Sequence, residues 1–489
     1  MQIKTQYSEA LTNNIERTFT FAHAKNAHGM DVEAHNYNAV ETFNKLVARD
    51  PFGTFMELDG YGFLSTINAL ERYDIPYTPE QERKARVYYE VTKDMERTRS
   101  DVSFNYQENV EGTGIVKVDD PHIYTTETTI KSKRFIETLP RNKKTFNHIY
   151  EDKIPKALLD SAEQYEALKN SVENHVSCLI GGAGTGKSFV TSEIVEQLIL
   201  NGKHVTILAP THKAKSALQQ KLKRGAVQTI HSYVYGHSGK TDVIVIDEAG
   251  MIPTELMSKL ASVYEGEQLV FVGDKNQIPP IGYGRPFEVI QETFPTVELK
   301  ANRRSEAKDI IALGREIIGE PFNANIAQDN IYVVDTVEEA FGLGAEVLLT
   351  YTRDGVHKAN EIQRIKNGKQ AIDNGFSIGD KIIAKTNMKQ WFNGQLMTIV
   401  AYNKAEDEQG NIITFRTPYE LKNNFDLAYG LTIHKSQGSE WNTVAYQPTS
   451  WDTLNLAYVA VTRAKKKLIV VGGFPPRFKE EKAWLHLWN

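Results

Sequence analysis

The stretch LIGGAGTGKSFVTSEIVEQLIL, residues 179–200, decides the fold of this chain. An apolar run precedes Gly181 and a helical pattern follows Ser188, so the glycine-rich segment joins a strand to a helix. Small residues let the backbone fold around phosphate groups and direct its N–H groups at them, helped by the positive end of the helix. The spacing G-x-x-x-x-G-K-S therefore predicts a loop that binds ATP. The expected ATP-binding residues of this loop are Gly181, Gly182, Ala183, Gly184, Thr185, Gly186, Lys187 and Ser188.

Short apolar runs alternate with amphipathic helical patterns around this loop. Continuous apolar strands separated by helices are typical of a parallel sheet that is covered on both faces, so the fold class is predicted to be α/β. The first series of runs comprises residues 175–180, 204–209, 242–247 and 268–273. A second series comprises residues 345–352, 443–448 and 466–472.

The chain divides by composition into three predicted domains, which agrees with a length of 489 residues. Residues 1–150 are polar and rich in helical patterns, and Thr78 to Gln81 carry a helix start with a proline and a capping-box glutamine. Residues 151–298 and 299–489 are the two predicted α/β lobes. Within the second lobe, alternation with a period of two and glycine turns predicts a small antiparallel β-barrel insert at about residues 376–428.

A pair of carboxylates follows the predicted strand at residues 242–247. Ligands of parallel sheets bind at the carboxyl ends of the strands, which is where Asp247 falls. We expect Asp247 and the Ser188 hydroxyl to ligate Mg²⁺, Lys187 to reach the β- and γ-phosphates, and Glu248 to activate the attacking water. The alternative is that the two acids belong to ordinary helix N-cap chemistry.

The bulk composition indicates a soluble protein of the cytoplasm, and the expected host, a bacterium or a phage-infected cell, comes from the family resemblance described below. The formal net charge of −5 gives no basic signature for the whole molecule, so a nucleic-acid surface has to be local. Basic clusters such as residues 221–224 are candidates for it, or solvated faces. The single cysteine, Cys178, excludes an internal disulfide, and neither a signal peptide nor a membrane span is predicted.

Eight motifs occur in a recognisable order. They are GGAGTGKS (181–188), LAPTHKAK (208–215), TIHS (229–232), DEAG (247–250), VGDKNQIPP (272–280), LKANRRS (299–305), LTIHKSQGSEW (431–441) and AYVAVTRAKK (457–466). In this order they resemble the motifs of superfamily-1 helicases, most closely the RecD-like and phage Dda-type branch. The resemblance covers about residues 155–475, and a weaker one extends back to about residue 50. It implies two RecA-like lobes with ATP between them.

The resemblance also implies roles for residues outside the phosphate loop. Gln164 matches a glutamine that reads the adenine edge, although it also forms a capping box with Ser161. Gln277 matches a residue that senses the γ-phosphate. Arg304 and Arg463 match two arginines that the second lobe directs at the phosphates. Arg303 stands where relatives of opposite polarity carry an aromatic that stacks on adenine, and its cation would stack there instead. An arginine supplied by the opposite lobe makes hydrolysis conditional on closure of the cleft.

The nucleic-acid contacts implied by the resemblance lie in both lobes. Threonine side chains and nearby backbone suit phosphate oxygens, which gives binding that does not depend on sequence. Tyrosines can stack on any base; packing in the core or on the surface is their alternative role. The implied contacts are Thr211, His212, Thr229, His231, Tyr233 and Tyr283 in the first lobe, and Thr432, His434 and Lys435 in the second.

The chain departs from its relatives between Ser232 and the strand that leads to Asp247. Relatives carry a strand-splitting β-hairpin here, whereas residues 233–240 leave room only for a short turn. The resemblance implies an ATP-driven translocase on single-stranded DNA and a DNA helicase, and the 5′-to-3′ direction comes from the resemblance alone. The protein would act as a monomer on single-stranded or tailed duplex DNA, beside replication or recombination proteins. The alternatives are an RNA-directed motor, or an ATP-gated DNA-binding accessory that does not unwind.

Overall fold

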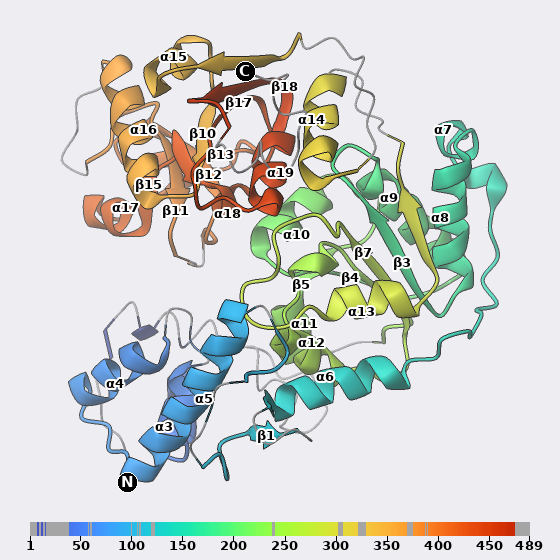
Figure 1. Ribbon diagram of the computed structural model, residues 1–489, viewed down its shortest axis with the longest axis vertical. Helices are drawn as coiled ribbons and strands as arrows, with labels where there is room; N and C mark the ends of the chain where they lie inside the picture. Colours follow the sequence, from blue (N-terminus) through green and yellow to red (C-terminus); the bar gives the residue numbers. More distant parts are fainter. Residues whose placement is uncertain are drawn as a thin grey trace.

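A computed structural model gives the structure of the chain (Figure 1). Its first and second lobes are two α/β units, and a mainly helical region precedes them. The residues that the structure describes are 7–8, 11–12, 15, 39–56, 58, 61–98, 100–104, 106, 109–118, 123–236, 240–301, 307–320, 329–368, 375–386, 388 and 390–474.

The first lobe is built on a six-stranded sheet in which every pairing is parallel. The strand order is β5-β4-β6-β7-β3-β8, so the predicted phosphate-loop strand β3 lies inside the sheet beside β7. The continuous apolar runs in the sequence predict fully buried strands of this kind. The strands are β3 (Val176–Gly181), β4 (Val205–Ala209), β5 (Val227–Thr229), β6 (Val243–Ile246), β7 (Gln268–Gly273) and β8 (Thr296–Leu299). The helices are η2 (Glu151–Lys153), α7 (Lys156–Leu159), α8 (Ala162–Glu173), α9 (Lys187–Leu200), α10 (His212–Gln219), α11 (Ile230–Gly236), η3 (Ala249–Met251), α12 (Thr254–Ala261) and α13 (Pro286–Thr293).

The second lobe repeats this architecture with five parallel strands in the order β16-β10-β17-β18-β9. Helices α14 and α19 pack against each other and contribute to its largest core cluster. The strands are β9 (Ile331–Val334), β10 (Val347–Thr350), β16 (Gly430–Thr432), β17 (Trp441–Gln447) and β18 (Ala464–Val471). The helices are α14 (Lys308–Ile318), α15 (Val337–Gly342), α16 (Arg353–Lys366), α18 (Ile433–Ser436) and α19 (Leu454–Thr462).

The insert in the second lobe is antiparallel, as its period of two predicts, but the predicted closed barrel is not confirmed. Its strands pair in the order β14-β13-β12-β11-β15, and no pairing among the described residues joins β14 to β15. The sheet is therefore open, with its apolar face covering a small core of its own around Trp391 and Phe415. Its elements are β11 (Lys381–Ala384), β12 (Leu396–Ala401), β13 (Lys404–Asp407), β14 (Ile412–Thr414), α17 (Pro418–Asn424) and β15 (Phe425–Leu427).

The N-terminal region is mainly helical and has two parts. Helices α2 to α4 enclose an aromatic cluster around Phe43, Phe52 and Phe55, whereas α6 packs on α12 and joins the core of the first lobe. The predicted helix start at Thr78 is confirmed, because Thr78 and Gln81 make reciprocal hydrogen bonds. The elements are α2 (Ala39–Val47), α3 (Pro51–Met56), α4 (Phe63–Arg72), α5 (Pro79–Thr98), β1 (Ile115–Lys117), β2 (Tyr124–Thr126) and α6 (Glu127–Thr138).

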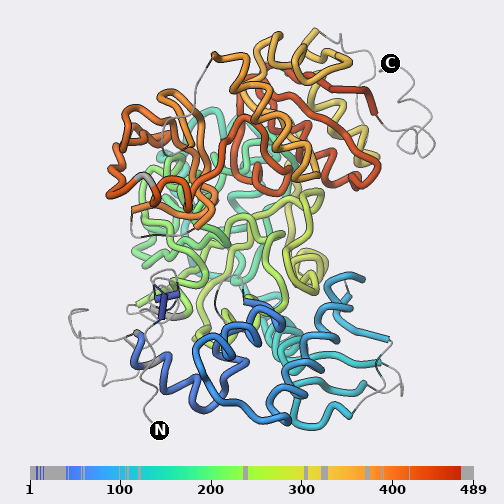
Figure 2. Tube along the Cα trace, turned by 90° about the vertical axis from the view of Figure 1, so that its left-hand side faces the viewer, coloured from blue at the N-terminus to red at the C-terminus, as the bar shows by residue number. Residues whose placement is uncertain are grey.

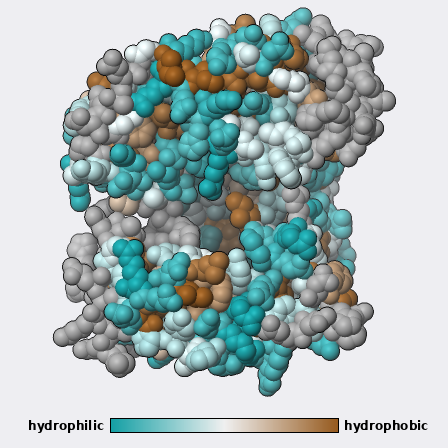
Figure 3. All heavy atoms as spheres, turned by 60° about the vertical axis from the view of Figure 1, so that its left-hand side comes forward, coloured by the Kyte–Doolittle hydropathy of each residue, from teal (hydrophilic) through white to brown (hydrophobic). Residues whose placement is uncertain are grey.

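The three parts are stacked along the long axis of the molecule, with the first lobe in the middle (Figure 2). The N-terminal helices lie at one end and the second lobe at the other. A space-filling view shows a hollow between the upper and lower parts of the molecule, with mainly polar side chains above it and both polar and apolar side chains in and below it (Figure 3). None of the described helices is long and apolar enough to span a membrane.

Candidate functional site

The phosphate loop leaves the end of β3 and turns sharply into α9. Gly184 and Gly186 adopt left-handed backbone conformations, with φ of 78° and 91°, which side chains with a Cβ rarely take. Helix α9 begins at Lys187, so its positive end faces the loop. The strand, the loop and the helix are therefore arranged as the sequence predicts.

Within the loop, side chains hold the backbone in place. The Lys187 ammonium donates hydrogen bonds to the carbonyl oxygens of Gly181 and Gly182, the second at 3.0 Å. The Thr185 hydroxyl donates to the Gly182 carbonyl at 2.9 Å. Lys187 thus lies over the concave side of the loop, where it can reach a bound phosphate chain.

The two acids of the DEAG motif follow β6, next to this loop. Burial and the neighbouring charge of Glu248 raise the pKa of Asp247 to about 7, against the opposing effect of Lys187. A buried carboxylate beside a second one favours binding of a cation. The oxygen donors of Asp247 and Ser188 therefore fit Mg²⁺, which would supply positive charge to stabilise the phosphates during their transfer.

Glu248 has a strained backbone. It is one of two non-glycine residues with positive φ among those the structure describes, at φ 51° and ψ 40°. Such a conformation costs on the order of 1–3 kcal/mol and is concentrated at functional sites. The strain turns the chain directly after Asp247 and directs Glu248 into the cavity that the phosphate loop lines.

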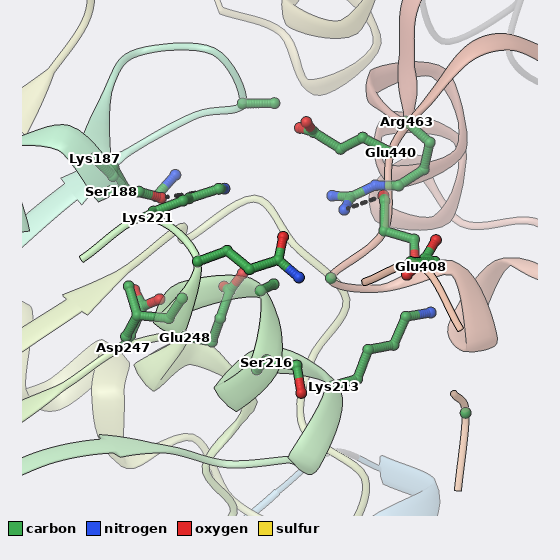
Figure 4. A pocket seen from close by; sticks show the side chains of 18 of the residues that line it. Lys187, Ser188, Lys213, Ser216, Lys221, Asp247, Glu248, Glu408, Glu440 and Arg463 are labelled. Carbon is green, nitrogen blue, oxygen red and sulfur yellow. Dashed lines mark hydrogen bonds between the residues drawn. The ribbon is translucent and has the colours of Figure 1, made fainter. Parts of the chain in front are cut away.

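This cavity has a volume of about 580 Å³ and lies between the two lobes. Figure 4 shows Lys187, Asp247 and Glu248 on one wall and Arg463 with Glu440 on the other. Arg463, at the end of α19, is 7% exposed and donates through Nη1 to the Ser439 carbonyl at 3.1 Å. A cation from the second lobe therefore faces the phosphate loop of the first.

The structure places two of the remaining predicted ATP-site residues, Gln164 and Gln277, but not the other two. Gln164 is buried, and its amide donates to the Thr185 carbonyl at 3.4 Å, while its backbone N–H bonds to the Ser161 hydroxyl. Gln277 lines the cavity. Arg303 and Arg304 lie outside the described residues.

Sequence reasoning missed two side chains of the site. Lys221, in a basic cluster read as a surface feature, lies 3.5 Å from the Ser188 hydroxyl and lowers the pKa of Asp247. Tyr458, on α19, bonds to the phosphate loop from the opposite lobe. No local sequence pattern marks either residue as part of the site, because the groups that each contacts there are distant from it in the sequence.

The predicted nucleic-acid contacts of the two lobes meet at one place. Lys213, next to the exposed Thr211 and His212, donates to the Lys435 carbonyl at 2.6 Å across the lobes. The His212 ring also stacks on Phe392 of the insert, with ring centroids 5.8 Å apart. Two motifs separated by more than two hundred residues thus form one continuous surface.

The two Thr-Ile-His stretches make the same local structure. Thr229 ends β5 and Thr432 ends β16, and each hydroxyl accepts a hydrogen bond from the backbone N–H three residues on, at 3.1 and 3.3 Å. Thr229 is buried, so its hydroxyl serves as a helix cap. His231 is exposed and His434 half-buried, with the His434 ring near Tyr351.

The prediction that Tyr233 and Tyr283 stack on bases is contradicted by their burial. Tyr233 is 0% exposed and belongs to the first-lobe core. Tyr283 is 5% exposed and packs against α5, and its hydroxyl is bonded to that of Thr126 at 3.0 Å. Both rings have their faces covered by protein, which leaves no face for a base.

The fold and the site together define a class. Two parallel-sheet lobes, a phosphate loop with a paired carboxylate, and an arginine that faces it from the other lobe characterise a two-lobed P-loop nucleotide-binding protein. Residues 160–331 match the AAA domain family, and residues 427–471 match the UvrD-like helicase C-terminal domain.

Two known proteins are similar to this chain over most of its length. An ATP-dependent RecD2 DNA helicase of Deinococcus radiodurans is 29% identical over 458 residues, which cover 84% of this chain and 63% of the relative. An uncharacterized protein of Methanocaldococcus jannaschii is 27% identical over 501 residues, covering 75% of this chain and 42% of the relative. The chain thus spans less than two thirds of the length of either. The sequence of the chain is thus similar to that of a RecD-type helicase over most of its length.

A solved structure of a Pif1 helicase from Bacteroides, in complex with ADP-AlF3 and single-stranded DNA, is also similar. It is 18% identical, covers 63% of this chain and 92% of its own, and superposes with a TM-score of 0.43.

Proposed function

We propose that this chain is an ATP-dependent translocase on single-stranded DNA and a 5′-to-3′ DNA helicase. The observation that carries the proposal is the cavity between the lobes, with the phosphate loop and Asp247 on one wall and Arg463 on the other. A nucleotide bound there would contact both lobes, so its hydrolysis would change how the lobes sit together. Such coupling is what a motor requires.

The residues take the following roles in this proposal. The phosphate loop and Lys187 bind the triphosphate, and Ser188 with Asp247 would hold Mg²⁺. Glu248 orients and deprotonates the attacking water, and Arg463 stabilises the charge of the transferring phosphate. Gln277 senses the γ-phosphate, and Gln164 reads the adenine. Arg303 and Arg304 keep the roles that the sequence implies for them.

The proposed DNA path runs over the joined surface of the two lobes. Thr211 and His212 from the first lobe meet Lys435 from the second there, because Lys213 bonds to the Lys435 backbone. Contacts of this kind would bind the phosphate backbone without regard to sequence. The assignment of DNA as the substrate draws support from the similar RecD2 protein, which is a DNA helicase.

Strand separation is the step with a specific alternative. Residues 230–236 form helix α11, and β6 begins at Val243, so the described residues here contain no hairpin that could split a duplex. The short connection between α11 and β6 favours a second candidate function, a translocase or ATP-gated accessory that acts on DNA without unwinding it.

The deciding experiment is an unwinding assay on duplexes with 5′ or 3′ single-stranded tails, run beside DNA-stimulated ATP hydrolysis. Unwinding from 5′ tails alone is the expected result. Unwinding from 3′ tails alone would overturn the polarity, and DNA-stimulated hydrolysis without unwinding would favour the second candidate. Stimulation by RNA tails in place of DNA would indicate an RNA-directed motor.

A further inference from the structure

Helix α19 presents one side of its first turns to the opposite lobe. Asn455 and Tyr458 are three residues apart and therefore lie on the same face of the helix. The Asn455 amide donates to the carbonyl oxygens of Asn276 and Gln277, at 2.9 and 3.3 Å. The second lobe is thereby hydrogen-bonded to the backbone around Gln277, the proposed γ-phosphate sensor.

The Tyr458 hydroxyl makes two hydrogen bonds, both to the first lobe. It accepts one from the backbone N–H of Ala183, in the phosphate loop, at 3.0 Å. It donates the other to the Asp274 carboxylate, on the loop that carries Gln277, at 3.1 Å. One hydroxyl of the second lobe therefore connects the two first-lobe loops that line the nucleotide site.

The residues around Tyr458 hold its hydroxyl close to the phosphate loop. The side chain is 3% exposed, and Asp274 is 4% exposed, so water has little access to replace either bond. A Cβ placed on Gly182 would lie 2.9 Å from the Tyr458 oxygen, so glycine is what allows the hydroxyl to approach the loop. The ring itself packs against Gly314 of α14.

The bond to Ala183 uses a backbone N–H of the phosphate loop, the kind of donor that phosphate oxygens accept from. Backbone N–H groups of a phosphate loop cradle the phosphates, and each N–H is a single donor. A phosphate oxygen carries charge, and hydrogen bonds to charged acceptors are stronger than those to a neutral hydroxyl. A phosphate that reaches Ala183 would therefore displace the Tyr458 oxygen.

We propose that the Tyr458 hydroxyl is a positioning group that joins the lobes through Ala183 and Asp274, and that a bound nucleotide displaces it from Ala183. The inference rests on the proposed ATP site. It makes opening of this contact a mechanical consequence of nucleotide binding. It also connects the phosphate loop to the loop of Gln277 through a residue of the opposite lobe.

The first test measures binding of ADP and of a non-hydrolysable ATP analogue to the full chain without DNA. Tyr458→Phe keeps the ring and removes only the hydroxyl, so the nucleotide no longer has to displace it. We expect the dissociation constants to fall about two- to tenfold, the range that one ordinary hydrogen bond supplies. Tyr446→Phe is the matched control, because the buried Tyr446 hydroxyl donates to Asp452 at 2.6 Å entirely within the second lobe.

The outcomes separate this inference from the proposed function. Tighter binding in Tyr458→Phe and unchanged binding in Tyr446→Phe support it. Unchanged or weaker binding in Tyr458→Phe overturns it, as does an equal gain in both variants, which would indicate a general loosening. A wild-type protein that binds no nucleotide would overturn the ATP site itself.

A second test needs no nucleotide. Gly182→Ala should push the Tyr458 oxygen away from the loop and lower the midpoint of thermal unfolding. In a Tyr458→Phe background the oxygen is gone, so the same alanine should cost clearly less, and the two substitutions should be non-additive. Strict additivity of the two effects would show that the hydroxyl does not contact the loop and would overturn the inference.

Discussion

At the scale of single residues, the neighbouring acids Asp247 and Glu248 have different environments, which suit them to different roles. Asp247 ends a buried strand, and burial together with Glu248 raises its pKa to about 7. Glu248 follows in a left-handed conformation and lines the cavity. This division of environment matches a metal ligand beside a base, and it is more than an ordinary helix N-cap requires, because Glu248 makes no side-chain cap hydrogen bond.

Replacing Glu248 by glutamine tests the assigned base. The amide keeps the shape of the side chain but cannot take a proton, so we expect ATP turnover to fall about 10²- to 10⁴-fold while ATP and DNA binding persist. Steady-state hydrolysis and equilibrium binding are the measurements. Glu255→Gln, which removes a surface carboxylate paired with Lys259 in the same lobe, is the control. Near-normal hydrolysis in Glu248→Gln would contradict the assignment.

Arg463→Ala tests the cation of the second lobe. An arginine that stabilises phosphoryl transfer is worth about 10³- to 10⁵-fold in rate, so hydrolysis should be lost with little change in ATP affinity. The substitution also removes hydrogen bonds to the carbonyls of Val459 and Ser439, so thermal unfolding is measured in parallel. Loss of hydrolysis accompanied by an equal loss of ATP binding would argue against the role.

At the scale of elements, the two Thr-Ile-His stretches are equivalent turns in the two lobes. Each ends an edge strand, β5 or β16, and starts a short helix with a threonine cap. The similarity is therefore structural before it is functional. It places the histidines and Lys435 at the carboxyl ends of the two sheets, where ligands of such sheets bind.

Removing either cap should destabilise its lobe. Thr229→Ala and Thr432→Ala lose the hydroxyl that accepts the third backbone N–H, so each should cost about 1 kcal/mol of unfolding free energy. Thr432→Ser retains the hydroxyl and is the control in denaturant unfolding. A Thr432→Ala protein as stable as wild type would indicate that water satisfies the N–H equally well.

The sequence predicted the elements that local patterns define and missed those that depend on distant partners. The phosphate loop, the parallel strands and the helix start at Thr78 follow from spacing and composition. Closure of the insert depends on whether β14 meets β15, which no local pattern encodes. Burial of Tyr233 was readable, because Ile230, Tyr233 and Val234 have helical spacing. Burial of Tyr283 was not, since its partners come from the N-terminal region.

At the scale of the whole molecule, the lobes are joined by a few polar contacts around the nucleotide cavity. Lys213 contributes one of them through the Lys435 carbonyl. Burial of the Lys213 ammonium lowers the pKa of this group to about 7. The charge of Glu408 opposes this shift, whereas the charges of Arg463 and Lys435 add to it. The contact is therefore sensitive to pH.

The sign of this dependence follows from proton binding. The unfolded chain holds the Lys213 proton up to about pH 10, whereas the folded protein releases it near pH 7, so this group makes folding more favourable as the pH rises between these values. The stability of wild type relative to Lys213→Met should therefore increase from pH 7 to pH 10 in urea unfolding. A difference that stays constant over this range would contradict the lowered pKa.

The first lobe depends on part of the N-terminal region. Phe135, Ile136 and Leu139 are buried in its core, and at about 1.5–3 kcal/mol each they represent a large share of the stability of a domain. We propose that the packing unit begins near residue 123 and not at 151. A fragment starting at 151 should unfold at a clearly lower temperature than one starting at 123. Equal midpoints would favour the boundary at 150.

The open sheet of the insert has a consequence for how the protein behaves in concentrated solution. Its outer strand β14 is an edge, and Ile412 on it is 52% exposed. Edge strands can pair with a second molecule and start aggregation unless charges discourage it. The neighbouring strand β13 carries Glu406 and Asp407, whose like charges would repel those of a second copy approaching this edge. High salt would screen the repulsion and promote self-association through this edge.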